Sequence, residues 1–200
     1  MATTQTKKTK VAIIGKGNVG GALARGLERA GHEVKAAGHD VDADREAAAW
    51  GDVVFLAVPF SALDDVARKL GPVLTGTTVV DVTNALGPDR NLAVGFTTSG
   101  AEELQKKLPK AHVVKAFNTV FAQHMDTGHV EGEALSAFVA GDNDNAKKIV
   151  LQLARDIGFD AVDVGSLKSA RSLEPLAFLN IQLGYGLKMG PKIGFKLVHA

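Results

Sequence analysis

The feature that most constrains the fold is a glycine-rich turn near the start of the chain. Residues 11–14 read VAII, and glycines follow at positions 15, 17 and 20. From Val19 to Ala30, apolar residues then recur at the three- and four-residue steps of one helix face. A buried strand, a tight turn and a helix in this order form the dinucleotide-binding fingerprint in its usual context.

Each part of this turn has an expected role toward a dinucleotide. Gly15 allows the tight turn, Gly17 lets the backbone approach a pyrophosphate, and Gly20 lets the helix lie close on the sheet. The helix N-terminus offers free N–H groups and a partial positive charge to the phosphates. A purely structural glycine turn is the alternative, because the spacing alone is weak evidence in a chain with 22 glycines.

The composition excludes several classes of protein. The 200 residues contain no Cys, which excludes disulfides, thiolate–metal sites and a Cys nucleophile. Lys and Arg number 23 against 22 Asp and Glu, so there is no electrostatic case for binding nucleic acid or an acidic membrane. No apolar run approaches the roughly 20 residues that a membrane span needs. We therefore expect a soluble, cytoplasmic protein with neither nucleic acid nor membrane as a partner.

Hydrophobic runs and helical patterns alternate over residues 10–165. This predicts a doubly wound α/β fold around a mainly parallel sheet, after a disordered polar leader at residues 1–9. The strands expected after the first are residues 33–37, 52–58, 77–82, 112–117, 135–140 and 161–164. The helices expected after the first are residues 43–50, 61–70, 99–108 and 143–157.

Three of these helices carry start signals. Ser61 with Asp64, and Ser99 with Glu102, have the spacing of a capping box. Asp142 or Asn143 is expected to cap the helix that ends at Gly158.

The end of the second expected strand bears on the choice of cofactor. Asp40 lies twenty residues after Gly20, where an acid normally accepts hydrogen bonds from the adenosine ribose and repels a 2′-phosphate. This favours NAD. His39, Arg45 and Lys16 lie near enough in sequence to supply cations for NADP, and a solvated turn aspartate is a third interpretation.

Two other loops are expected at the carboxyl edge of the sheet. The loop Val58–Pro59–Phe60 follows a central strand, and ligands bind at that edge in open α/β sheets. Thr83 and Asn84 follow the next strand, where they can bond a ribose or a carboxamide, or equally form a turn before Gly-Pro.

His124 and His129 raise the question of a metal site. Two histidines five residues apart do not share one helix face, and no third ligand lies near them in sequence. We therefore expect no metal.

The tail, residues 166–200, differs in kind from the rest. Between Leu173 and Tyr185 apolar residues leave almost no polar face, so a second surface is needed to cover the helix, and a partner chain is the natural one. Pro175 suits the first turn of that helix, which places its start near residues 172–174.

Together these features resemble a known family. The glycine loop, the Val58–Pro59 strand end, Asn118 and the tail are similar to the NADP oxidoreductases that depend on the deazaflavin coenzyme F420. They are also similar to the bacterial relatives of those enzymes and to the oxidoreductase domain of the STEAP metalloreductases. The specific part is the tail, which reads ARSLEPL at residues 170–176, LNI at 179–181 and GFKL at 194–197.

The resemblance implies a Rossmann domain with a short C-terminal helical extension that closes a substrate slot and forms a homodimer. It implies hydride transfer between nicotinamide and a flavin or F420-like acceptor, with no side chain that must act as an acid or base. The residues carried over are Gly15, Lys16, Gly17, Asn18 and Val19 at the pyrophosphate; Val58, Pro59, Thr83, Asn84 and Ala85 at the nicotinamide; and Asn118, Thr119 and Leu173 to Leu176, Pro175 included, on the acceptor side.

The sequence departs from the family at residues 38–40, where members carry a small polar residue and an Arg for the 2′-phosphate. Here the three residues are Gly, His and Asp, so NADP and NAD both stay open. Two other functions also stay open: a non-catalytic dinucleotide-binding sensor or subunit, and a reductase of another small substrate.

Overall fold

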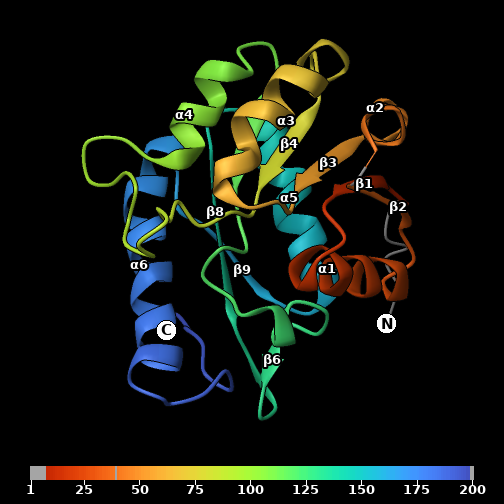
Figure 1. Ribbon diagram of the computed structural model, residues 1–200. Helices are drawn as coiled ribbons and strands as arrows, with labels where there is room; N and C mark the ends of the chain where they lie inside the picture. The colour runs from red at the N-terminus through yellow and green to blue at the C-terminus, as the bar shows by residue number, and fades with distance from the viewer. Residues whose placement is uncertain (1–7, 39, 199–200) are drawn as a thin grey trace.

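Seven strands form the central sheet of the computed structural model, which describes residues 8–38 and 40–198 (Figure 1). They are β1 (Lys10–Ile14), β2 (Glu33–Ala37), β3 (Val53–Leu56), β4 (Thr78–Asp81), β5 (His112–Lys115), β8 (Ser136–Gly141) and β9 (Asp160–Asp163). Their order in space is β2-β1-β3-β4-β5-β8-β9. The first five strands are parallel, whereas β8 runs antiparallel to β5 and carries β9 parallel to itself.

Helices cover both faces of this sheet. They are α1 (Asn18–Arg29), α2 (Val41–Trp50), α3 (Leu63–Leu70), α4 (Gly100–Lys107), α5 (Asp144–Ile157) and α6 (Ala170–Ile181). A short hairpin of β6 (His129–Val130) and β7 (Glu133–Ala134) projects from the fold (Figure 1). A π-helical turn, Gln182–Gly186, continues α6.

The core has two halves because successive residues of each strand point to opposite faces. In β1, Val11 and Ile13 pack into the half under α1 and α5, while Ala12 and Ile14 pack into the half under α2, α3 and α4. A strand buried on both sides reads as a continuous apolar run, which is why β1 and β3 were recognisable in the sequence. The predicted doubly wound α/β fold is confirmed.

Two predicted caps are confirmed and one is wrong. Asn143 accepts a hydrogen bond from the Ala146 N–H at 2.9 Å, and Ser99 accepts one from the Glu102 N–H at 3.2 Å. Ser61 is not a cap, because Pro59 starts a 3₁₀ turn, Phe60–Ala62, that runs directly into α3 and encloses Ser61.

The start predicted for the tail helix is also wrong. α6 begins at Ala170 rather than at residues 172–174, so Pro175 lies inside it. A 3₁₀ turn, Leu167–Ser169, precedes α6 and already has helical geometry where it ends, which lets the helix begin earlier than the proline indicates. Of the expected leader, residues 1–7 lie outside the described residues.

Side chains of α6 fasten it to the carboxyl edge of the sheet, beside α4 (Figure 1). Arg171 binds Glu102 of α4 through two nitrogens, with N···O distances of 2.7–3.2 Å. Glu174 accepts hydrogen bonds from the Gly100 and Ala101 N–H groups at 2.9 and 3.2 Å. Asn180 donates to the Thr119 carbonyl at 3.1 Å. The helix is therefore held by directed polar contacts as well as by packing. None of the described helices is long and apolar enough to cross a membrane.

The Arg171–Glu102 pair predicts a pH-dependent contribution to stability. The hydrogen bond from Arg171 holds the pKa of Glu102 below its ordinary value of 4.5. A folded-state pKa below the unfolded one gives stabilisation that is full above the unfolded value and is lost as pH falls through the folded one. We expect Glu102→Gln to lower the free energy of unfolding at neutral pH by about 1.5–3 kcal/mol.

Urea unfolding of the wild type and of Glu102→Gln at neutral pH and at about pH 3 checks this. Protonation of Glu102 at the lower pH should shrink the difference in the free energy of unfolding between the two proteins. Glu28→Gln, a change at an exposed position of α1, is the matched control and should have little effect at either pH. A difference of the same size at both pH values would contradict the prediction.

Candidate functional site

The carboxyl edge of the sheet is hollowed at the topological switch point between β1 and β3. β2 lies on one side of β1 and β3 on the other, so the connections that follow β1 and β3 diverge, and ligands bind at such switch points. Three pockets of about 540, 320 and 310 Å³ adjoin one another there. Lys16 lines the first two, and Gly17 and Asn18 line the first and the third, so together they form one cleft.

Two glycines allow the backbone to close up at the end of β1. Gly15 has a φ of +119°, and a Cβ there would lie 2.1 Å from the Ala57 carbonyl oxygen. A Cβ on Gly20 would lie 1.9 Å from the Gly15 carbonyl oxygen. A side chain at Gly15 would push the turn away from the segment after β3, and one at Gly20 would push α1 away from the turn, so both glycines are structural requirements.

Gly17 serves the opposite purpose, because the space beside it is open. A Cβ at Gly17 would meet no atom of the described structure within 4 Å. Gly17 is the N-cap of α1 without a side-chain hydrogen bond to the first turn, and that turn holds no acidic residue. The first N–H groups of α1 therefore face open space and attract an anion. These N–H groups form a cradle that could hold the pyrophosphate of a dinucleotide.

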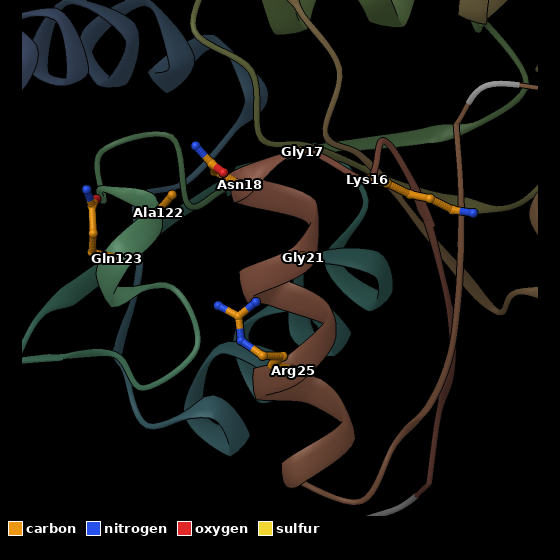
Figure 2. Close-up of a pocket in the computed structure, with 7 residues that line it drawn as sticks. All are labelled: Lys16, Gly17, Asn18, Gly21, Arg25, Ala122 and Gln123. Atoms are coloured by element: carbon orange, nitrogen blue, oxygen red, sulfur yellow. The ribbon is translucent and has the colours of Figure 1, made fainter.

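The first pocket runs from this cradle along the flank of α1 (Figure 2). Lys16 and Asn18 extend to opposite sides of the first turn, and the side chain of Arg25 lies further along the helix. Gln123, in the segment after β5, lines the opposite side of the same pocket (Figure 2). Sequence reasoning missed Arg25 and Gln123, because only the folded chain brings the two residues together.

The second pocket lies at the end of β2, where a ribose is expected. Asp40 lines it, and its Oδ1 accepts the Ala43 N–H at 2.8 Å, so this carboxylate also caps α2. Lys35 lines it too, with its ammonium 3.3 Å from Glu46 and 5.0 Å from the centre of the Trp50 ring.

The cations expected here from the sequence are only partly brought together. Lys16 lines the pocket. Arg45 does not, because its Nε donates to the Lys69 carbonyl at 3.1 Å, toward α3. His39 lies outside the described residues. Lys35 was missed, although an exposed cation near the end of a strand is a signal that could have been read.

The third pocket lies at the ends of β3 and β4, beside the glycine loop. The structure brings together here most of the residues expected near the nicotinamide, Val58, Pro59, Thr83 and Asn84, and adds Val19, which was expected at the pyrophosphate. Two other residues expected at this edge of the sheet do not line the pocket. Phe60 packs toward Gly100 of α4, and Ala85 is fully buried.

Asn118 joins this pocket to α6. Its Nδ2 donates to the Leu173 carbonyl at 3.0 Å and lies 3.4 Å from Asn84 Oδ1. Thr119 is buried and contributes its carbonyl to Asn180, while Pro175 is half-buried. The residues expected on the acceptor side thus lie where α6 meets the carboxyl edge.

Two buried polar atoms at this edge lack a hydrogen-bond partner among the described residues: Thr83 Oγ1 and Asn118 Oδ1. Buried polar atoms are normally paired, so an unpaired hydroxyl on a pocket-lining residue indicates a ligand as its partner.

The residue before Asn118, Phe117, has an unusual backbone conformation. Phe117 is fully buried and has a φ of +64°, a region that bulky residues rarely occupy. The turn places the Phe117 ring 5.8 Å from that of Phe55 and 5.6 Å from that of Phe159. Strain of this kind persists only where the surroundings over-determine it, and it is typical of functional sites.

A buried ion cluster lies behind the third pocket. The Lys115 ammonium is 3.0 Å from Asp81 Oδ2 and 3.1 Å from Glu174 Oε1, and all three side chains are essentially inaccessible. Burial alone lowers the pKa of Lys115, but the two carboxylates outweigh this effect and raise the pKa above its ordinary value. Sequence reasoning missed the cluster. The signal was a charge inside each of two apolar strands, VVD and VVK.

The two histidines considered as metal ligands bind backbone carbonyls. His124 Nε2 lies 2.7 Å from the Pro191 carbonyl, and His129 Nδ1 lies 2.8 Å from that of Thr127. Within residues 8–38 and 40–198, no group of three or more potential metal ligands comes together.

Comparison with known proteins identifies relatives of this site. The family model described as NADP oxidoreductase, coenzyme F420-dependent, matches residues 35–85, and a Rossmann-like domain model matches residues 1–50. The F420-dependent NADP reductase of Methanocaldococcus jannaschii is 32% identical over 154 residues, which cover 72% of this chain and 67% of that protein.

Two further relatives extend the likeness. Metalloreductase STEAP3 of Rattus norvegicus is 31% identical over 192 residues, or 88% of this chain. The chain spans only 38% of the length of STEAP3 and 36% of that of its STEAP2 relatives. A crystal structure of a candidate F420-dependent NADP-reductase from Arthrobacter sp. superposes with a TM-score of 0.86 at 28% identity, covering 96% of this chain and all of that one.

The open space at Gly17 predicts a variant that separates binding from folding. Gly17 has a φ of −72° and a ψ of −169°, which any residue adopts, so Gly17→Asp should leave the fold intact. Its carboxylate would occupy the cradle and repel a pyrophosphate, and we expect binding of NADPH and NADH to weaken by at least about 100-fold.

Calorimetric titration measures the affinity, circular dichroism confirms the fold, and Gly17→Ala is the control that adds bulk without charge. Unchanged affinity in a folded Gly17→Asp protein would show that the pyrophosphate does not bind at the start of α1.

Proposed function

The chain belongs to the family of NADP oxidoreductases that depend on coenzyme F420, and on that premise we propose that it transfers a hydride between NADP(H) and a flavin- or deazaflavin-like acceptor. The observation that carries the proposal is the continuity of the cleft. An open anion cradle at Gly17 leads into the pocket at the ends of β3 and β4, and Asn118 links Asn84 of that pocket to the Leu173 carbonyl of α6.

In the proposed mechanism the protein binds the cofactor and the acceptor and aligns them, and no side chain transfers a proton. NADP(H), when bound, supplies or accepts the hydride. The first N–H groups of α1 and Lys16 hold the pyrophosphate. Val58, Pro59 and Thr83 bound the space for the nicotinamide, and Asn118 borders the side from which the acceptor approaches. Alignment of two reacting groups by such walls supplies a large part of the rate enhancement.

The pocket at the end of β2 holds both positive charges that favour NADP and negative charges that oppose its 2′-phosphate. Lys16 and Lys35 line this pocket and supply two cations for a 2′-phosphate. Asp40 and Glu46 line the same pocket with negative charge, although Asp40 also caps α2 and Glu46 is paired with Lys35. NADP use therefore depends on the Lys35–Glu46 pair opening toward the phosphate, and NAD is the competing cofactor.

We also propose a homodimer formed through the C-terminal extension at residues 166–200. Leu179 is 46% exposed, and Tyr185, Leu187 and Met189 are 59%, 71% and 59% exposed. Four large apolar side chains on one short segment are costly to leave in water, and a second copy of the same segment would cover them.

An oxidation assay tests the function directly. Purified protein is mixed with NADPH or NADH and with FMN, FAD, F420 or a ferric chelate, and the loss of nicotinamide absorbance is followed. We expect turnover with at least one flavin-class acceptor and a higher rate with NADPH than with NADH, because two lysines border the ribose pocket.

The Gly17→Asp protein is the matched inactive control. Tight binding of NADPH without oxidation by any acceptor would contradict the proposal and favour a non-catalytic dinucleotide-binding protein. Turnover with ferric chelates alone would favour a different acceptor.

A further inference from the structure

Lys115 is fully buried, yet it is the meeting point of two parts of the site. Besides Asp81 and Glu174, its ammonium donates to the Thr83 carbonyl oxygen at 2.6 Å. Asp81 ends β4 and Glu174 belongs to α6, so one ammonium joins the sheet, the tail helix and the loop after β4.

Thr83 is held on both sides of its backbone by this cluster. Its N–H donates to Asp81 Oδ1 at 2.9 Å, while its carbonyl accepts from Lys115. Thr83 lines the pocket assigned to the nicotinamide, and its buried hydroxyl has no partner among the described residues. The cluster therefore fixes the position of Thr83, the one residue with a hydroxyl among the described residues that line this pocket, and that hydroxyl is unpaired.

The Glu174 carboxylate links the same cluster to two helices. It accepts the Gly100 and Ala101 N–H groups at the start of α4 and pairs with Lys115 through Oε1. Movement of α6 away from the sheet would leave Lys115 with one carboxylate fewer, and the hold on the Thr83 carbonyl would change with it.

Folding alone does not require this arrangement. Buried ion clusters pay a large desolvation cost, and apolar or neutral replacements of similar volume are often as stable. Lys115 also has no route to the reacting atoms, because it lines none of the three pockets. The two carboxylates raise the pKa of Lys115, so its ammonium stays charged in the folded protein.

We propose that Lys115 is a positioning residue, which holds the Thr83 hydroxyl toward the nicotinamide carboxamide and couples that position to the C-terminal helix. The proposal rests on the proposed function, because it needs the nicotinamide to occupy the pocket at the ends of β3 and β4.

The test removes the charges together, because Lys115→Met alone would bury two facing carboxylates and unfold the protein. In the triple variant Asp81→Asn, Lys115→Met, Glu174→Gln, the amide oxygen at position 81 can still accept the Thr83 N–H. The single amide oxygen at position 174 can accept one of the two α4 N–H groups, those of Gly100 and Ala101, that Glu174 binds through separate oxygens. The Thr83 carbonyl is the backbone group that loses its donor.

The readout is a pair of affinities, measured by calorimetry for NADP and for 2′-phospho-ADP-ribose, which lacks the nicotinamide. We expect the triple variant to bind 2′-phospho-ADP-ribose, the fragment, as tightly as the wild type does. It should bind NADP about five- to tenfold more weakly, because one hydrogen bond to the nicotinamide is lost. Thr83→Val should do the same alone and should cost nothing further in the triple background, because Lys115 acts through Thr83.

Lys147→Met is the matched control. Lys147 is a second buried lysine, bonded to the Gly165 carbonyl at 3.3 Å and paired with Asp163 at 3.2 Å, and it lines none of the three pockets. Its replacement should leave both affinities unchanged.

Equal weakening of NADP and the fragment, or a full additional loss from Thr83→Val in the triple variant, would overturn the proposal. If the triple variant does not fold, Thr83→Val alone still tests the proposal. An unchanged affinity of the Thr83→Val protein for NADP would overturn it. Failure of the wild type to bind either compound would instead refute the proposed function.

Discussion

The site depends on the close approach of three backbone segments at the carboxyl end of β1. The Gly15 N–H donates to the Ala37 carbonyl at 2.7 Å, the Ala57 N–H donates to Ile14, and α1 starts almost in contact with the same turn. This contact fixes where α1 begins and how it is directed, so its unpaired N–H groups open onto the cleft. Without it, neither the anion cradle nor the pocket between β3 and β4 would have its shape.

The second requirement is that the tail of the chain stays on the same edge. Ala170, Leu173 and Ala177 of α6 are buried, and its polar side chains make the directed contacts that fix its position. Arg171 and Glu174 bind α4, and Asn118 and Asn180 link α6 to the loop after β5. A helix held by directed bonds cannot slide, so the acceptor side of the cleft has a defined wall. The proposed hydride transfer needs such a wall, because it depends on alignment rather than on acid–base groups.

Local features of the sequence were sufficient for most of the fold and for the glycine turn that borders the cleft. The apolar runs of β1 and β3, the spacing of the glycine loop and the Asn143 cap depend on neighbouring residues only. The antiparallel direction of β8 and the partners of Lys115 depend on contacts between distant segments, which hydrophobic periodicity does not report. The early start of α6 was missed for a related reason: the pattern around Pro175 does not show that a 3₁₀ turn leads into the helix. Arg45 was placed at the ribose by its sequence distance, whereas the packing of α2 on α3 directs it to Lys69.

The central claim is that a pyridine dinucleotide crosses the end of β1 and places its nicotinamide beside α6. A crystal structure of the chain with NADP tests this most directly. The account predicts pyrophosphate oxygens on the N–H groups that follow Gly17, and the nicotinamide between Pro59, Thr83 and Asn118. A dinucleotide bound elsewhere, or one whose nicotinamide points away from α6 into solvent, would contradict it.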